Sequence, residues 1–171
     1  IKSLTLLIAP HPYIEFFLTR IRKELLMHAS KRKTIPDHLK PFSKALATQC
    51  FLNEYAYAQS SEEENYVNKL ILKAHHSKEE FDQYLAVIAC YVPIHELEFK
   101  REWLNSYLTL NEESNLLIKI QFEEPLQEEK LKSSLRSFST ISDGVSVKNK
   151  AMYEKNPYPR YRCAQFTCKE I

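Results

Sequence analysis

Hydrophobic residues recur at steps of three and four along most of this chain, the spacing of one face of an α-helix. The clearest such stretch runs from Asp37 to Gln59, where the stripe is Leu39, Phe42, Leu46, Cys50, Asn53 and Tyr57. In its second half, from Cys50 to Tyr57, apolar side chains lie all round the axis, as in a helix enclosed by others. We therefore expect a central helix that is N-capped by Asp37 and surrounded by the rest of the chain.

Three polar residues interrupt the enclosed half of this helix, namely Gln49, Asn53 and Glu54. A buried amide or carboxylate without partners costs about 1–3 kcal/mol, so each needs hydrogen bonds. In one interpretation, backbone groups at the ends of neighbouring helices supply them. In the other, the three side chains face a substrate or a partner domain.

Amphipathic stretches flank the central one on both sides. A first helix is predicted before it, with the stripe Ile14, Phe17, Leu18, Ile21 and Leu25, and with Arg20, Arg22, Lys23 and Glu24 off the stripe. Ser61 with Glu64 is a predicted capping box for a helix that carries Val67, Leu70, Ile71 and Ala74. Ser77 with Glu80 repeats that signature before Phe81, Tyr84, Leu85 and Ile88, and Pro93 is the expected stop. Such short connections favour antiparallel neighbours.

The pattern weakens after Pro93. Residues 94–107 are interpreted as a helix, although Leu104 to Leu110 also fits an extended segment. Asn111 is a predicted cap for a helix that carries Leu116, Leu117 and Ile120 and stops at Pro125. Leu131 and Leu135 then mark a helix from Glu128 to Phe138.

The region after Phe138 differs in composition. Residues 139–144 form a polar, turn-prone linker, and Val145 to Lys155 is expected to form one more helix. The predicted fold is all-α: a compact bundle of about seven to eight antiparallel helices in residues 1–138. Residues 139–171 are expected to hold the linker helix and an irregular Pro-rich segment.

Composition removes several classes of function. The 171 residues carry 24 Lys and Arg against 22 Asp and Glu, so a net charge of +2 gives no general electrostatic case for nucleic-acid binding. Lys31 to Lys33, with Arg20, Arg22 and Lys23, is expected to be solvated surface, with phosphate contact as the alternative. No apolar run approaches the roughly 20 residues of a membrane span, and the N-terminal run does not resemble a signal peptide. We expect a cytoplasmic protein without a membrane partner and, since the sequence opens at Ile1, both ends to be cuts from a longer polypeptide.

A single glycine, Gly144, limits the chemistry available to the chain. Nucleotide and phosphate cradles use glycines for close backbone approach and positive φ, so no nucleotide-type cofactor is expected to bind these residues alone. The four cysteines, Cys50, Cys90, Cys163 and Cys168, are too scattered for a disulfide framework, and no metal site is expected. A cysteine hydrolase using Cys50 with His28, His75 or His76 is one further hypothesis, whereas helix capping is the simpler interpretation of His75 and His76.

The C-terminal segment resembles a known family. Residues 153–161, Tyr-Glu-Lys-Asn-Pro-Tyr-Pro-Arg-Tyr, are similar to the Tyr-Glu-Glu-Asn-Pro-Tyr-Pro-Arg-Trp signature of bacterial S-adenosylmethionine-dependent methyltransferases that often carry N-terminal tetratricopeptide repeats. Residues 49–55, Gln-Cys-Phe-Leu-Asn-Glu-Tyr, resemble the Gln-Cys-Phe-x-Asn-Glu-Tyr motif of the same family, and residues 124–126 fit another of its elements. Lys155 and Tyr161 depart from the signature.

The resemblance implies a helical region upstream of a methyltransferase domain, since the glycine-rich cofactor loop of the family follows the signature. S-adenosylmethionine would then bind the parent protein and not this chain, which would have no catalytic residues. The candidate interdomain or substrate contacts are Gln49, Asn53, Glu54, Tyr153, Asn156, Tyr158, Arg160 and Tyr161. The first hypothesis is therefore a noncatalytic domain for substrate recognition or interdomain packing. The alternative is a free-standing helical adaptor that binds a protein partner through a groove around Asn53 and the C-terminal tyrosines.

Overall fold

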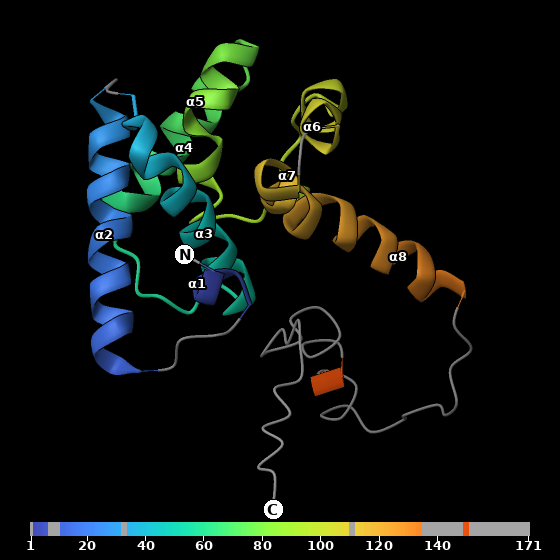
Figure 1. Cartoon of the computed structure of the whole chain (residues 1–171), viewed down its shortest axis with the longest axis horizontal. Helices are drawn as coiled ribbons and strands as arrows, with labels where there is room; N and C mark the ends of the chain where they lie inside the picture. The colour runs from blue at the N-terminus through green and yellow to red at the C-terminus, as the bar shows by residue number, and fades with distance from the viewer. Residues whose placement is uncertain (1, 7–10, 32–33, 110–111, 135–148, 151–171) are drawn as a thin grey trace, which may run out of the picture.

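The computed structural model describes residues 2–6, 11–31, 34–109, 112–134 and 149–150, and the elements among them are helices without any strand. This confirms the all-α prediction. Figure 1 shows α2 along one edge, α3, α4 and α5 beside it, and α6 to α8 on the opposite side. The α-helices are α1 (Lys2–Leu6), α2 (Pro12–Ser30), α3 (Lys40–Leu52), α4 (Ser61–Ala74), α5 (Lys78–Ile88), α6 (Arg101–Leu108), α7 (Glu112–Ile118) and α8 (Glu124–Ser134). Short 3-10 turns are η1 (Asp37–Leu39) and η2 (Ile94–Glu96), and η3 (Lys119–Glu123) is a π-helix.

The central position of α3 is confirmed. Every residue from Ala45 to Leu52 is buried, and α3 packs against α1, α2, α5, α7 and η3. A helix buried on all faces is expected to be largely apolar all round, and within this stretch only Thr48 and Gln49 are polar. Its predicted start is wrong in detail, because Asp37 opens the 3-10 turn η1 and its carboxylate pairs with Lys40 at 2.6 Å instead of capping α3.

The predicted extension of the central helix to Gln59 is wrong, since α3 ends at Leu52. The backbone N–H of Glu54 donates to Phe51 O at 3.1 Å and that of Tyr55 to Cys50 O at 2.8 Å, the pair of bonds of a Schellman motif. Glu54 and Tyr55 adopt left-handed φ values of 52° and 55°. Glycine usually occupies such positions, so its absence concealed this helix end from sequence analysis.

Helix α2 has two unequal halves. Leu18, Leu25, Leu26 and Ala29 are buried, whereas residues 11–17 are all exposed, Ile14 and Phe17 of the predicted stripe included. Arg22, expected off the stripe, is buried instead. In Figure 1 the first turns of α2 extend beyond the other labelled helices.

The α4–α5 hairpin follows the prediction closely. Phe81, Tyr84, Leu85 and Ile88 are all buried, and the Ser77 hydroxyl accepts from the Glu80 N–H at 3.2 Å. The capping box of α4 lies one residue earlier than predicted, on Ser60 and Glu63. Helix α5 ends at Ile88, before Pro93, and the predicted helix over 94–107 is divided into η2, an irregular stretch and α6.

Pro125 does not stop the helix, contrary to the prediction, because α7, η3 and α8 are consecutive in sequence. Proline removes an N–H, which leaves the Gln121 carbonyl without its α-helical donor. The His95 Nδ1 lies 3.2 Å from this carbonyl oxygen and, in the tautomer that carries a proton there, donates to it. The π turn widens the helix just before the proline ring, and together these features let the helix continue.

Helix α8 projects from the rest of the molecule (Figure 1), and Leu131 on it is exposed. None of the described helices combines the length and apolar character that crossing a bilayer requires. Asn111, Leu135, Phe138 and nearly all of residues 139–171 lie outside the described residues, so the second predicted domain stays a prediction.

Candidate functional site

Gln121 in η3 is the hydrogen-bonding centre of the core, although sequence analysis did not single it out. Its Nε2 donates to Ala47 O at 2.8 Å and to Ala89 O at 3.1 Å. Its Oε1 accepts from the Ile94 N–H at 3.4 Å and from the Tyr55 hydroxyl at 3.3 Å. The side chain is fully buried and ties α3, the end of α5, η2 and the Schellman turn together. The amide at position 121, between Ile120 and Phe122 in a largely apolar stretch, was the available signal.

The three polar residues predicted from the central helix have different environments. Gln49 is 0% exposed and Asn53 4%, whereas Glu54 is half-buried. A substrate or partner on the surface therefore reaches Glu54 more readily than Gln49 or Asn53. The neighbouring Tyr55 hydroxyl, 3.4 Å from Ala89 O and bonded to Gln121, anchors this turn to the core.

A second buried polar cluster surrounds Arg22. Its Nη2 donates to Ala58 O at 2.7 Å and to Tyr57 O at 3.5 Å, and its Cζ lies 4.3 Å from the centre of the Tyr91 ring. Tyr91 in turn donates its hydroxyl hydrogen to Glu63 Oε1 at 3.0 Å. The cluster thus connects α2, the 53–60 loop, the N-terminus of α4 and the end of α5. Arg22 shares the helical spacing of Leu18, Leu25 and Leu26, which was the sequence signal for its burial.

The charges in this cluster are unevenly compensated. Burial by itself raises the pKa of Glu63, but hydrogen bonds from the Ser60 N–H and hydroxyl and from Tyr91, with the Arg22 charge, lower the pKa below its ordinary value. Burial raises the pKa of Tyr91 and of Tyr57, so both hydroxyls stay protonated at neutral pH. Arg22 Nε, Asn53 Oδ1 and the Tyr57 hydroxyl are buried without a hydrogen bond of good geometry.

The cysteine hydrolase hypothesis gains no support from the geometry. Cys50 is fully buried and so is not accessible to a substrate at the surface. Burial raises the pKa of its neighbour Cys90 well above the ordinary value, which disfavours a thiolate at Cys90. Each of the three histidines has another contact. His28 Nε2 lies 3.1 Å from Thr34 O, His76 Nδ1 lies 2.7 Å from Leu72 O, and the His75 ring packs on Phe99. In the tautomer that carries a proton on Nδ1, His76 donates to this carbonyl near the end of α4, which agrees with the capping interpretation. The described residues hold no group of three or more His, Cys, Asp or Glu placed to hold a metal ion.

Among the described residues, exposed aromatic side chains gather at the start of α2. Tyr13, Phe16 and Phe17 are 81%, 68% and 56% exposed, and Ile14 is 43% exposed. We call these four residues the aromatic face. Large apolar side chains gathered on one exposed helix end are typical of interaction surfaces.

The other predicted contacts, Tyr153, Asn156, Tyr158, Arg160 and Tyr161, lie outside the described residues. The structure therefore leaves the docking role of this segment as a prediction. Comparison with protein-family models, with curated proteins and with solved structures gave no match to this chain.

Proposed function

We propose that this chain is a noncatalytic helical domain of a larger S-adenosylmethionine-dependent methyltransferase, in which it packs against the catalytic domain and contributes to substrate recognition. The proposal joins the order of the two family-like motifs, at residues 49–55 and 153–161, to one surface observation. That observation is the aromatic face of α2, whose exposed apolar side chains would be buried favourably against a protein neighbour.

The aromatic face supports docking on energetic grounds. Burying a Phe side chain contributes about 1.5–3 kcal/mol, so Phe16 and Phe17 together can drive an interdomain contact. The first turns of α2 extend beyond the other labelled helices (Figure 1), and residues 11–17 are all exposed. The catalytic domain of the same polypeptide is the occupant that the motif order favours.

The single glycine supports a noncatalytic role. A cofactor cradle requires backbone that approaches the ligand closely, and Gly144 alone does not supply such a loop. The 49–55 motif has a structural explanation in the described region, since it forms the last turn of α3 and the Schellman turn. A motif that shapes a helix end fits a scaffold that supports a catalytic domain.

Calorimetry with S-adenosylmethionine and the 171-residue chain tests the division of labour. We expect no binding, and a dissociation constant near 1 μM, about −8 kcal/mol, would contradict the proposal. Reading the codons that follow Ile171 is the companion test. A glycine-rich strand-to-helix turn in that frame is expected.

The docking role is tested by supplying the chain and the downstream catalytic domain as separate polypeptides and measuring their association. Phe16→Asp with Phe17→Asp is expected to weaken it at least tenfold. The matched control is Leu72→Asp on α4, which is also exposed but lies outside the aromatic face. Equal losses in both variants would count against this surface.

A free-standing adaptor remains the second proposal, because the same aromatic face suits a separate protein partner. The buried position of Asn53 moves the adaptor surface away from the groove expected around that residue and onto α2. A reading frame without a methyltransferase domain would favour the adaptor.

A further inference from the structure

The aromatic face is the first part of a longer exposed stripe on α2. Helical spacing places Arg20 and Lys23 on the same side of the helix as Tyr13, and Lys31 follows at the C-cap. All three basic side chains are exposed. We call the surface from Tyr13 to Lys31 the outer stripe. At 1.5 Å per residue it is about 27 Å long, which matches a partner helix of about five turns.

The outer stripe carries an excess of positive charge. Of its described residues, Arg20, Lys23 and Lys31 are basic and Glu24 is acidic. Glu15 lies on another side of α2, since its carboxylate contributes to the raised pKa of Tyr57 and so faces the 53–60 loop. Complementary charge steers and orients protein partners, so the outer stripe favours a partner with acidic side chains.

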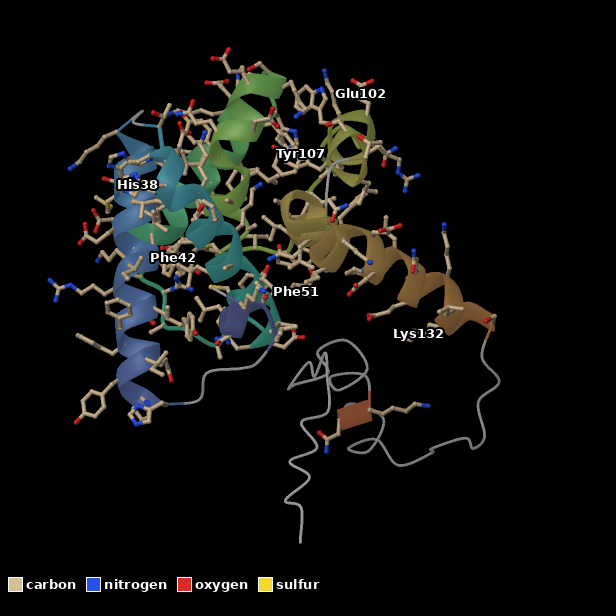
Figure 2. All side chains as sticks on the ribbon, viewed as in Figure 1. His38, Phe42, Phe51, Glu102, Tyr107 and Lys132 are labelled. Carbon is tan, nitrogen blue, oxygen red and sulfur yellow. The ribbon has the colours of Figure 1, made fainter. Side chains whose placement is uncertain are left out.

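A cavity of about 350 Å³ adjoins the second half of the outer stripe. It lies between α2 and the segment that contains η1, whose His38 is labelled beside α2 in Figure 2. Glu24 and Lys31 belong both to its lining and to the outer stripe. Its apolar lining comes from Ile21, Leu25, Met27, Ile35, Pro36 and Leu39. Leu39 is 37% exposed, so part of this apolar lining is accessible from the surface.

An amphipathic helix matches these three features together. Helices that dock in grooves insert apolar anchor residues at spacings of three and four, and charged residues on their flanks fix the orientation. A bilayer surface matches the aromatic and basic residues but places no single side chain in a cavity. Residues 153–161 of this chain carry Lys155 and Arg160 against Glu154, so their charge does not complement the outer stripe.

We propose that the outer stripe binds an acidic amphipathic helix of the neighbouring domain. Apolar residues of that helix cover Phe16 and Phe17, carboxylates face Arg20 and Lys23, and one apolar anchor enters the cavity beside Leu39. This inference rests on the docking role proposed for the aromatic face and adds the chemistry of the partner to it.

Panning a random library of 18-residue peptides against the 171-residue chain tests the partner chemistry. The recovered peptides are expected to be rich in Asp and Glu and to carry apolar residues three and four apart. NMR of the strongest peptide bound to the chain should show contacts to the methyl groups of Ile35 and Leu39. Recovered peptides without an acidic excess, or without contacts to the cavity, would overturn the inference.

Arg20→Glu with Lys23→Glu reverses the charge at two exposed positions and is expected to weaken the strongest peptide at least tenfold. Lys69→Glu with Lys119→Glu is the matched control, because it changes the net charge equally at exposed positions outside the outer stripe. Equal losses in the two double variants would overturn the inference.

The same peptide separates this inference from the docking role itself. Binding that Phe16→Asp with Phe17→Asp abolishes, but that charge reversal leaves unchanged, would overturn the acidic partner alone. Failure to recover any peptide that depends on Phe16 and Phe17 would contradict the docking role as well. Two further outcomes would overturn the inference: binding of phosphatidylglycerol vesicles through these residues, or a dimer of the chain that the same Phe substitutions dissociate in sedimentation.

Discussion

Gln121 and Arg22 each bring a long polar side chain into the core, but they differ in how completely their polar atoms are hydrogen-bonded. Gln121 uses both of its amide hydrogens and its oxygen in contacts with Ala47, Ala89, Ile94 and Tyr55. Arg22 makes hydrogen bonds through Nη2, but its Nε is buried without one, as are Asn53 Oδ1 and the Tyr57 hydroxyl beside it.

The comparison shows two ways in which a buried polar side chain affects the fold. A fully satisfied amide holds elements in one arrangement, because every alternative leaves several polar groups unpaired. A buried charge that is partly satisfied bears a desolvation cost that its contacts need not recover, so an apolar residue of similar volume is often tolerated. We infer that Gln121 is a stabilising centre and that Arg22 contributes less to stability than its burial implies.

The largest predicted effect is the loss of the Gln121 amide. Gln121→Met keeps the volume but removes the acceptor of the buried Ile94 N–H and the Nε2 bonds to the Ala47 and Ala89 carbonyls, so we expect a loss of about 3 kcal/mol in the free energy of unfolding. Urea denaturation measures it. Gln127→Met on α8, an exposed position, is the control and should change stability by less than about 0.5 kcal/mol.

The next largest predicted change in stability concerns the Schellman turn, which places Tyr55 in hydrogen-bonding contact with Gln121. Glu54→Gly relieves a left-handed backbone conformation and is expected to stabilise the protein by about 1 kcal/mol. Glu54→Ala, which removes the same carboxylate but keeps Cβ, should not stabilise it. Thermal unfolding distinguishes the two variants, and equal shifts in midpoint would show that the side chain and not the backbone determines the result.

Arg22→Met tests the other side of the comparison. We expect a smaller loss than for Gln121→Met, because the lost bond to Ala58 O and the lost attraction to Glu63 are partly offset by removal of a buried charge. Denaturation alongside Gln121→Met gives a direct contrast between two substitutions by the same residue. Similar losses in both variants would break the comparison.

The smallest effect is a pH dependence that arises in the Arg22 cluster. The folded-state pKa of Glu63 lies below the ordinary 4.5, so the unfolded chain binds the proton more readily. The stability that ionised Glu63 contributes is complete above pH 4.5 and is lost as the pH falls through its folded pKa. Glu63→Gln should flatten the acid side of the stability profile.

The sequence by itself determined the helical class and most of the buried faces. Short-range spacing is sufficient for this, because residues three and four apart share one face whatever they pack against. The enclosed stretch of α3, four of the five buried residues of α5 and the cap at Ser77 were all predicted from such spacing.

Only the tertiary structure decided where α3 ends, how the helix passes Pro125 and which groups Arg22 contacts in the core. In each case the deciding partner is far away in sequence. The turn at Tyr55 is hydrogen-bonded to the Gln121 side chain. The backbone carbonyl of Gln121 lies within hydrogen-bond distance of His95 Nδ1. Arg22 packs on the Tyr91 ring and donates to the Ala58 carbonyl. Polar groups are satisfied by whatever the fold brings near them, and the local pattern of residues does not encode that proximity.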